Sequence, residues 1–513
     1  MYTKILSGAT VGVNAYIVET EVDISNGLPM FNLVGSIGNE TREARERVTV
    51  ALKNNGICLP ASRITVNLSP ADMKKDGTGF DLSIAVGLLH NMGYFGDEAV
   101  EDTVFLGELS LYGDIKKVKG VLPIISSAAK RGIKRCVVPL SNLMEAAVVP
   151  GIEVYGAGSI VDVLSFLSGK DRDALTKMSI SPEEILSADG NDIYEDFSEI
   201  AGQQGAKRAA KIAACGFHNF LMTGPPGSGK SMIARRIPGI MPPLTIDESL
   251  ELTSIVSVAG LLKDGEALAT KRPYMNPHHS ISEAALVGGG RGIKPGMISL
   301  AHRGVLFMDE LPEFGRSMID CLRQPLEDRK ILISRADGNV SYPADFMLVC
   351  AMNPCPCGYY PDRHKCRCTE SQMLRYISRI SGPILDRIDL CVELHPVDVG
   401  SLSDMGRGET SENMRKDVMR VRAIQDERFK GTQYRFNSDI KPSDIQEYCR
   451  LGSKEEECMK KLYEGMGMSA RTYYRVLRVA RTIADISESG DIKEEHIYEA
   501  ACYRPDEKYW RGR

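Results

Sequence analysis

The glycine-rich segment GPPGSGKS at residues 224–231 constrains the fold more than any other part of this 513-residue chain. It fits the pattern G-x-x-x-x-G-K-[ST], in which backbone N–H groups surround phosphate oxygens at the start of a helix. The apolar segment FHNFLMT precedes it, and KSMIARRI, which is suited to start a helix, follows it. A strand, a glycine loop and a helix in this order predict an α/β fold that binds a nucleotide. A chance Gly/Pro turn would lack this context.

Each residue of the loop has an expected role in holding ATP and Mg²⁺. Lys230 would reach the β- and γ-phosphates, and the hydroxyl of Ser231 would hold Mg²⁺. The remaining loop residues would form the phosphate cradle: Gly224, Pro225, Pro226, Gly227, Ser228 and Gly229.

Two further apolar segments end in polar residues that ATP hydrolysis requires. GVLFMDE (304–310) ends in Asp309, which would position Mg²⁺, and Glu310, which would polarise the attacking water. DFMLVCAMN (345–353) ends in Asn353, placed to touch the γ-phosphate or its water. The alternative for the first segment is a buried strand with a capping Asp. Because open α/β sheets build sites at the carboxyl ends of their strands, we expect these groups to meet there.

Composition limits the other classes of function. The formal net charge of −5 excludes nucleic-acid binding by the molecule as a whole, so a basic patch would have to be local. No apolar run approaches the roughly 20 residues that cross a bilayer, and the N-terminus lacks the features of a secretory signal. Nine of the thirteen cysteines are scattered singly among apolar residues, which is typical of a reducing cytoplasm. We therefore expect a cytoplasmic protein with no membrane partner.

Changes in pattern along the chain predict its division. Residues 1–168 form one α/β domain, in which strand-like and helix-like segments alternate from residue 11 onward, and residues 169–195 form a polar linker. A second alternating region, with a Cys-rich insert, covers 196–397, and 398–513 is mainly helical.

Several long strings carry a specific resemblance. They are NPHHSISEAALVGGG, PGMISLAHRGVLFMDELPEF, RQPLED, AMNPCPCGYY, SGPILDRIDL and SARTYYRVLRVARTIADI. With them the chain resembles AAA+ ATPases and, more narrowly, the magnesium-chelatase-like bacterial proteins called ComM or YifB. The resemblance spans nearly the whole chain, and implies an AAA+ P-loop core with a helical lid.

The resemblance also implies roles for individual arginines. Arg387 matches the arginine finger that acts on a neighbouring subunit's ATP, with Arg379 as a competitor nearby. Arg471 matches a lid arginine that contacts the γ-phosphate. A surface arginine is the alternative for each. A finger acting in trans requires an oligomer. The resemblance implies that this oligomer is a homohexameric ring.

The first domain is similar to the proteolytic domain of Lon proteases, which use a Ser-Lys dyad. Aligning the KDG of KKDGTGF (74–80) places Gly79 at the serine, and aligning the second motif places Leu122 at the lysine. With both groups missing, we expect a scaffold for the ring or a substrate rather than a peptidase.

Three insertions have open roles. Residues 271–297 carry Lys271, Arg272, Arg291 and Lys294, and form either a basic loop inside the ring or a structural loop. Their His278 and His279 are expected to point apart and to form hydrogen bonds rather than bind a metal. Residues 330–344 predict a β-hairpin, and Asp337 at its tip argues against gripping phosphates there.

The third insertion contains two C-x-C pairs in NPCPCGYYPDRHKCRC. Four thiolates suffice for a tetrahedral zinc site, with His364 as a substitute ligand, and independent thiols are the alternative. The predicted ligands of a structural, non-catalytic Zn²⁺ are Cys355, Cys357, Cys366 and Cys368.

Three functions follow from these features. The first is a ring ATPase that moves single-stranded, duplex or branched DNA, as a branch-migration helicase in recombination and natural transformation. The second is a motor subunit for tetrapyrrole metallation, and the third is a protein-remodelling ATPase. The Lon-like domain and the Cys-rich insert favour the first over the second.

Overall fold

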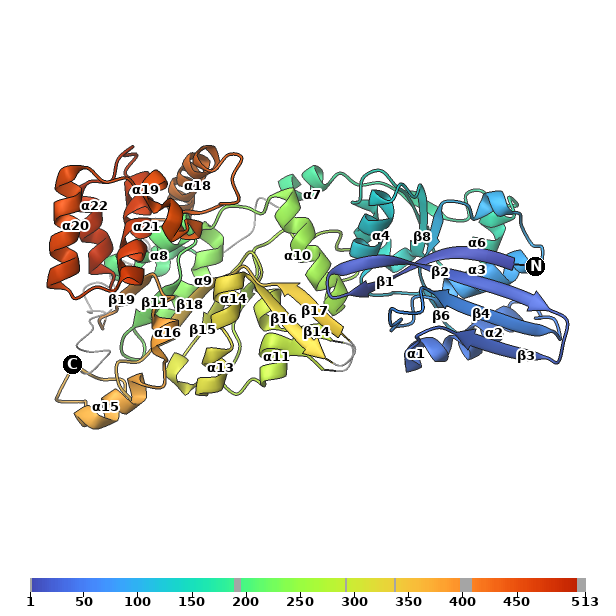
Figure 1. Ribbon diagram of the computed structural model, residues 1–513, viewed down its shortest axis with the longest axis horizontal. Helices are drawn as coiled ribbons and strands as arrows, with labels where there is room; N and C mark the ends of the chain where they lie inside the picture. The colour runs from blue at the N-terminus through green and yellow to red at the C-terminus, as the bar shows by residue number, and fades with distance from the viewer. Residues whose placement is uncertain (1, 189–194, 291–292, 336–337, 397–407, 505–513) are drawn as a thin grey trace.

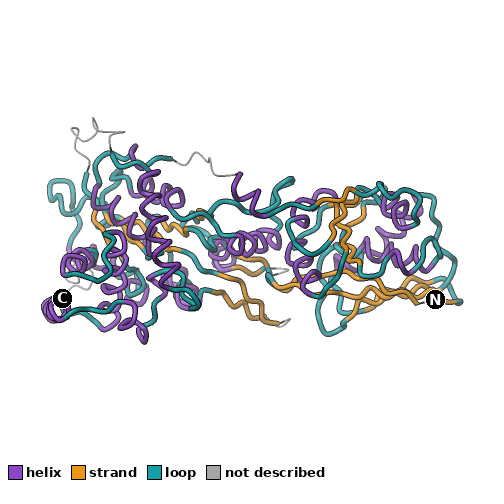
Figure 2. The backbone as a smooth tube through the Cα atoms, turned by 90° about the horizontal axis from the view of Figure 1, so that it is seen from above, coloured by secondary structure: helices purple, strands orange, loops and turns teal. Residues whose placement is uncertain are grey.

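The computed structural model describes residues 2–188, 195–290, 293–335, 338–396 and 408–504. The molecule is elongated, with an N-terminal α/β unit at one end and C-terminal helices at the other (Figures 1 and 2). The nucleotide-binding unit lies between them. None of the helices in these ranges combines the length and apolar character needed to cross a bilayer.

The N-terminal unit is built on a mixed sheet of eight strands in the order β10-β9-β8-β5-β1-β2-β4-β3. The strands are β1 (Tyr2–Val11), β2 (Asn14–Ser25), β3 (Met30–Val34), β4 (Arg63–Ser69), β5 (Thr103–Phe105), β8 (Arg135–Pro139), β9 (Glu153–Ala157) and β10 (Thr176–Met178). A small ribbon of β6 (Glu108–Leu109) and β7 (Ile115–Lys116) accompanies them. Its helices are α1 (Asn39–Arg42), α2 (Ala44–Asn54), α3 (Asp81–Asn91), α4 (Val121–Lys130), α5 (Leu143–Ala147) and α6 (Ile160–Leu167).

Two features of this unit differ from the simplest interpretation of the sequence. The polar N-terminal residues form β1, which pairs along its whole length with β2. β10 and α7 (Pro182–Ala188) lie in the predicted linker, and β10 extends the sheet by pairing with β9. The division of the chain into four segments stays a prediction.

The nucleotide-binding unit contains a sheet of five parallel strands in the order β12-β15-β18-β11-β19. They are β12 (Tyr274–Met275), β15 (Val305–Met308), β18 (Met347–Met352), β11 (Phe220–Thr223) and β19 (Leu390–Glu393). β15 and β18 are buried along their whole length, which explains their continuous apolar sequences. The helices of this unit are α8 (Gln204–Gly216), α9 (Lys230–Ile240), α10 (Ile246–Ala259), α11 (Glu283–Val287), α12 (Met297–Leu300), α13 (Arg316–Asp320), α14 (Arg323–Asp328), α15 (Glu370–Ile377) and α16 (Gly382–Leu385).

The C-terminal region is helical, as predicted. Its helices are α18 (Ser411–Arg428), α19 (Ile445–Tyr448), α20 (Ser453–Gly465), α21 (Ala470–Ile486) and α22 (Glu494–Cys502). One hydrophobic core joins these helices to α8, α9 and the parallel sheet. The helical region therefore packs directly on the layer that carries the glycine loop.

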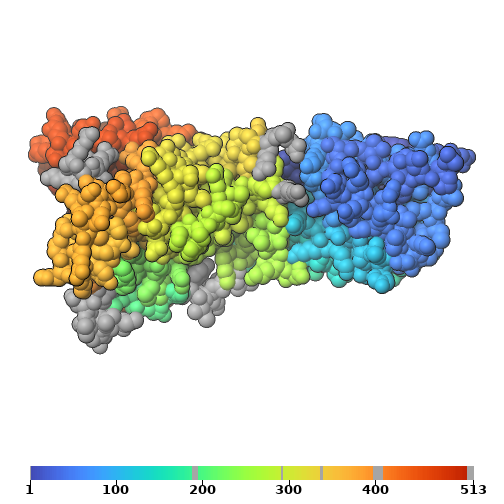
Figure 3. Space-filling view, turned by 90° about the horizontal axis from the view of Figure 1, so that it is seen from below, coloured from blue at the N-terminus to red at the C-terminus, as the bar shows by residue number. Residues whose placement is uncertain are grey.

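The N-terminal unit is attached to the nucleotide-binding unit along α10, and the space-filling view shows their atoms abutting (Figure 3). The buried carboxylate of Glu145 accepts hydrogen bonds from the Leu122 N–H (3.0 Å) and from the hydroxyl of Ser257 on α10. The Lys117 ammonium donates to Asp264 at 2.7 Å. Because a buried carboxylate needs partners, this contact is specific as well as apolar.

A second attachment joins the β1–β2 turn to a hairpin of the nucleotide-binding unit. The hairpin consists of β16 (Lys330–Arg335) and β17 (Gly338–Pro343). A Cβ atom at Gly12 would lie 2.7 Å from Val340 Cγ1 and 3.0 Å from the Ser341 carbonyl oxygen. Gly12 also has a φ of +64°, so both its backbone and the close approach favour glycine.

We expect Gly12→Ala to lower the melting temperature of the full chain more than Gly93→Ala does. Both positions have a positive φ, but a Cβ at Gly93 would meet no described atom within 4 Å. The difference between the two variants therefore reports the clash with the hairpin, which should lower the free energy of unfolding by about 1–3 kcal/mol. Equal melting temperatures for the two variants would show that the turn does not press on the hairpin.

Candidate functional site

The predicted Mg²⁺ ligands meet at the carboxyl edge of the parallel sheet. The Ser231 hydroxyl, on the first turn of α9, donates to Asp309 Oδ2 at 2.9 Å. Asp309 follows β15, and its other carboxylate oxygen accepts from the Glu310 N–H at 3.0 Å. A hydroxyl and a carboxylate oxygen in contact suit Mg²⁺, which prefers oxygen ligands.

Lys230 lies between the glycine loop and Asn353. Its ammonium donates to the carbonyl oxygens of Gly224 (2.7 Å) and Pro225 (2.9 Å), and to Asn353 Oδ1 (3.3 Å). Burial lowers the pKa of this ammonium, while Asp309 and Glu310 oppose the shift. The ammonium thus faces the space inside the loop, held by carbonyls that a phosphate can replace.

The glycine loop has the conformation that a phosphate cradle requires. Gly227 and Gly229 have φ values of +77° and +95°, and Gly229 immediately precedes α9. The hydroxyl of Ser228 is buried without a hydrogen-bond partner in the described structure. An unsatisfied donor beside a helix N-terminus fits a phosphate group. The described residues therefore fit ATP.

Sequence reasoning missed Gln203, which braces the loop from outside. Its side-chain amide donates to the carbonyl oxygens of Ser228 (3.1 Å) and His395 (2.7 Å). It also has a φ of +54° before α8. An isolated glutamine in a polar segment carries no motif, so only the tertiary structure identifies this contact.

Glu310 is exposed and has a strained backbone, with a φ of +51°. Its carboxylate lies 4.0 Å from Nδ1 of His279, and His278 Nδ1 lies 2.8 Å from the Ser280 hydroxyl. The expected hydrogen-bonding role of this pair is therefore confirmed for His278. The expectation that the two rings point apart is wrong, because their centroids are 4.1 Å apart. The chain turns at this point instead of running extended.

The three predicted arginines have different surroundings. Arg387 is largely buried, and its guanidinium binds the Glu327 carboxylate and the Pro383 carbonyl oxygen. Arg379 pairs with Glu313 at 3.0 Å, directly beyond the Asp–Glu pair of the same chain. Arg471 is exposed at the start of α21. Within this single chain, the structure does not bring the three together at the glycine loop.

The four predicted zinc ligands lie together, with all four sulfur atoms within 4.8 Å of one another. Burial raises the pKa of the Cys357 thiol, but the Tyr359 N–H and the neighbouring thiols outweigh it and lower the pKa to about 6. A thiolate among three further thiols is a donor set suited to Zn²⁺. The substitute ligand His364 is not part of this cluster.

The cysteine cluster lies against the nucleotide site. Gly358, with a φ of +85°, approaches the glycine loop so closely that its Cβ would lie 2.7 Å from Pro226 Cδ. The same Cβ would lie 3.7 Å from Asn353 Cγ. The Cys-rich segment is therefore packed on two predicted nucleotide-binding elements.

The basic insertion is less exposed than expected. Arg272 is buried, and it donates to the Pro242 and Arg303 carbonyl oxygens and to Glu248. Of the two roles that the sequence leaves open for this insertion, the structural one therefore holds for Arg272, because its guanidinium bonds inside the fold. Lys294 is exposed on β14 (Lys294–Pro295), which pairs with β13 (Gly288–Gly289). Arg291 lies outside the described residues.

The predicted hairpin at 330–344 is confirmed by the antiparallel register of β16 and β17. Asp337 at its tip lies outside the described residues. The ribbon of β13 and β14 lies beside this hairpin, since the Tyr342 hydroxyl donates to the Ile293 carbonyl oxygen at 2.5 Å. The two ribbons thus form one composite element.

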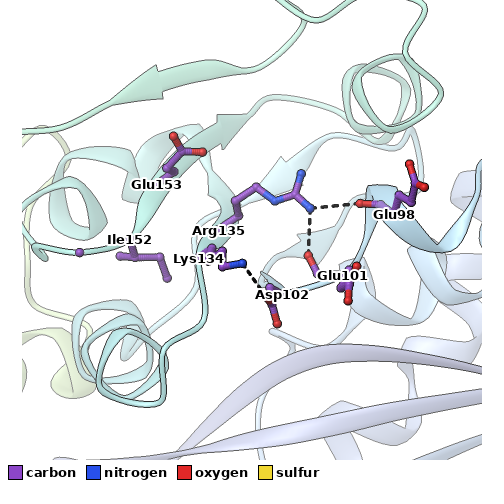
Figure 4. Close-up of a pocket in the computed structure, with 8 residues that line it drawn as sticks. Glu98, Glu101, Asp102, Lys134, Arg135, Ile152 and Glu153 are labelled. Carbon is purple, nitrogen blue, oxygen red and sulfur yellow. Dashed lines mark hydrogen bonds and ion pairs between the residues drawn. The ribbon is translucent and has the colours of Figure 1, made fainter.

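A separate open hollow of about 770 Å³ lies on the N-terminal unit, far along the molecule from the glycine loop (Figures 1 and 4). Its lining includes Lys134, which pairs with Asp102, and Arg135, which donates to backbone carbonyls of Glu98 and Glu101. Both cations thus already have partners within the hollow, and the other charged residues of its lining are carboxylates. The hollow therefore has no resemblance to the phosphate site.

A parallel sheet that presents a glycine loop beside an Asp–Glu pair, with a helical region packed on the same layer, defines an AAA+ ATPase. Three family models match the chain: magnesium chelatase, subunit ChlI, over 196–402; subunit ChlI of Mg-chelatase over 20–142; and the ChlI C-terminal model over 408–504.

Full-length relatives identify the family within the AAA+ class to which the chain belongs. Competence protein ComM of Haemophilus influenzae is 42% identical over 98% of this chain and 97% of its own length. YifB of Escherichia coli is 40% identical over 97% and 96%. The chain therefore belongs to the ComM/YifB family of magnesium-chelatase-like proteins. Lon protease 2 of Bacillus subtilis is 29% identical over 40% of each chain, which confirms the Lon-like character of the N-terminal region.

We expect Gly358→Ala to weaken nucleotide binding about ten-fold. A side chain there displaces Pro226 of the glycine loop, and a loss of about 1.4 kcal/mol of binding free energy corresponds to a ten-fold change in the dissociation constant. A fluorescent ATP analogue would measure the dissociation constant. Gly431→Ala is the matched control, since its φ is +77° and its Cβ would meet no described atom within 4 Å. Equal affinities for the two variants would exclude a contribution of the Cys-rich segment to the pocket.

Proposed function

We propose that the chain is the subunit of an ATP-driven ring motor that moves DNA, acting in branch migration during recombination and natural transformation. The observation that supports this most is the alignment with competence protein ComM over nearly the whole of both chains. The composite element of two ribbons, with Lys294 exposed on one of them, offers a surface suited to a phosphate backbone.

The geometry supports a role for each residue in ATP hydrolysis. Lys230 would exchange its carbonyl partners for the β- and γ-phosphate oxygens, while Ser231 and Asp309 would hold Mg²⁺. Mg²⁺ supplies neutralisation of phosphate charge when bound. Glu310 directly follows Asp309 and is exposed, so it would accept the proton of the attacking water. Asn353, in contact with Lys230, would orient the γ-phosphate.

A ring explains the position of the proposed finger. Arg387 binds no residue of its own glycine loop, whereas Arg379 lies beside its own Asp–Glu pair through Glu313. An arginine that completes a site in trans must belong to a neighbouring subunit. We therefore assign the finger to Arg387, the lid contact to Arg471, and a homohexamer to the assembly.

The test is the rate of ATP hydrolysis with single-stranded, duplex and four-way-junction DNA over a range of salt concentrations. We expect DNA to stimulate hydrolysis and the stimulation to fall steeply as salt rises, because phosphate contacts release counterions. Glu310→Gln should retain nucleotide binding and slow hydrolysis by a factor of about 10²–10⁴.

Two results would contradict the proposal. Stimulation by unfolded protein but not by DNA would identify a protein-remodelling ATPase. Stimulation by a tetrapyrrole together with its metallation partners would identify a chelatase motor. In either case the assignment of the ATPase site would be unaffected, and only the substrate on which the ATPase acts would differ.

We further propose that Cys355, Cys357, Cys366 and Cys368 hold a structural Zn²⁺. The support is a set of four sulfur atoms within 4.8 Å of one another, on a segment with little hydrophobic core beyond the cysteines themselves. Zinc would substitute for that core by joining both ends of the loop.

Elemental mass spectrometry of the purified full chain should find about one zinc per chain. Cys366→Ser should lose the metal, since Cys366 is buried within the cluster. Cys58→Ser, at an exposed cysteine of the N-terminal unit, should retain it. Metal-free protein in which all four cluster thiols react freely with a thiol reagent would contradict the assignment.

A further inference from the structure

The proposed finger is not free in the single chain. Arg387 Nη2 is bound to a carboxylate oxygen of Glu327, and Nη1 donates to the Pro383 carbonyl oxygen at 2.5 Å. The side chain is 15% exposed, whereas that of Glu327 is 58% exposed. One partner of this pair is therefore held in place by the fold, and the other can move into solvent.

This pairing conflicts with the chemistry expected of a finger. An arginine stabilises the transition state by placing an uncompensated positive charge on the phosphoryl oxygens. A carboxylate bound to the same guanidinium neutralises that charge, and it would itself repel the phosphate. Hydrolysis in a neighbouring subunit therefore favours an Arg387 that has left Glu327.

We propose that Glu327 is a positioning residue that holds Arg387 in an inactive state until the foot of the hairpin moves. This inference rests on the proposed finger role of Arg387 and adds a control to it. The pair acts as a latch between the hairpin and the arginine that serves the neighbouring nucleotide.

The location of Glu327 connects the latch to the proposed DNA-binding element. Glu327 belongs to α14. This helix ends at Asp328, and the hairpin begins two residues later, at Lys330. Between them, Arg329 has a φ of +54° and pairs with both Asp345 and Asp439. Since this single residue joins α14 to the hairpin, a movement of the hairpin that loosens the Arg329 pairs would carry α14, and with it Glu327, away from Arg387.

The release required is small. An ion pair with one exposed partner is worth little in free energy, and its loss shifts a two-state balance by about two- to five-fold. Arg387 Nε is also buried without a hydrogen-bond partner among the described residues, so its present position does not satisfy the whole guanidinium. A bound polymer that favours the open position by a similar small free energy would therefore shift the balance toward the free Arg387.

The experiment compares steady-state ATP hydrolysis by full-length wild type and Glu327→Gln, with and without DNA. We expect the variant to raise the DNA-free kcat about two- to five-fold at unchanged KM, because the pair opposes the transition state and not nucleotide binding. Its rate with saturating DNA should equal that of wild type, so the ratio of stimulation falls. Glu46→Gln, which removes an exposed Arg–Glu pair of the N-terminal unit, is the matched control and should leave all rates unchanged.

A second background separates this inference from the function on which it rests. In Arg387→Ala, adding Glu327→Gln should have no effect, since there is no finger left to release. An unchanged or lower kcat in Glu327→Gln alone, or the same rise in both backgrounds, would overturn the latch and leave the finger intact. Normal hydrolysis by Arg387→Ala itself would overturn the finger, and the latch with it.

Discussion

The parallel register of β11, β15 and β18 is the constraint on which the nucleotide site depends. Val349 of β18 lies opposite Phe220 of β11 and Phe307 of β15, so the carboxyl ends of the three strands lie within two residues of one another. Each strand then delivers its polar group to the same edge. A shift of one strand by one residue would exchange the side chains that it packs on the two faces of the sheet, and would move its polar group about 3.3 Å along the strand direction. The register therefore contributes to the contact between Ser231, which follows β11, and Asp309, which follows β15.

A network of ion pairs, with Arg303, Asp345 and the Asp439 side chain buried and its other members partly exposed, extends this edge to the hairpin and the C-terminal helices. Arg303 binds Asp345 and Glu251, and Asp345 also lies 3.6 Å from Arg329, which pairs with Asp439. The hydrogen bond from His302 lowers the pKa of Glu251 to about 2, against the effect of burial and with the help of Arg303. Buried charges of this kind are costly unless each has its partner, so they favour one arrangement over others. The junction before the hairpin is therefore the place where the core, the hairpin and the lid meet.

The local motifs were predictable and the partners of isolated side chains were not. The strands around the glycine loop and Asn353 follow from continuous apolar runs, and the hairpin follows from its turn. Arg272 and Gln203 carry no such pattern. Arg272 is buried against a carbonyl about 30 residues away, and Gln203 donates to a carbonyl about 190 residues away. The pairing of Arg387 with Glu327 spans 60 residues. A charged residue in a sequence predicts exposure only on average, because a long arginine side chain can reach hydrogen-bond partners inside the fold.

In the N-terminal unit, the position that aligns with the catalytic lysine of Lon proteases is used for packing between domains. A lysine base at position 122 would need a cavity open to substrate, whereas Leu122 is fully buried in a core that includes Ala267 and Leu268 of the nucleotide-binding unit. Its backbone N–H supports Glu145, and Glu145 in turn holds Ser257 on α10. α10 also carries Glu251, the first member of the ion-pair network. Position 122 is thus part of the contact that attaches this domain to the nucleotide-binding unit, and a lysine there would place a charge in that apolar contact.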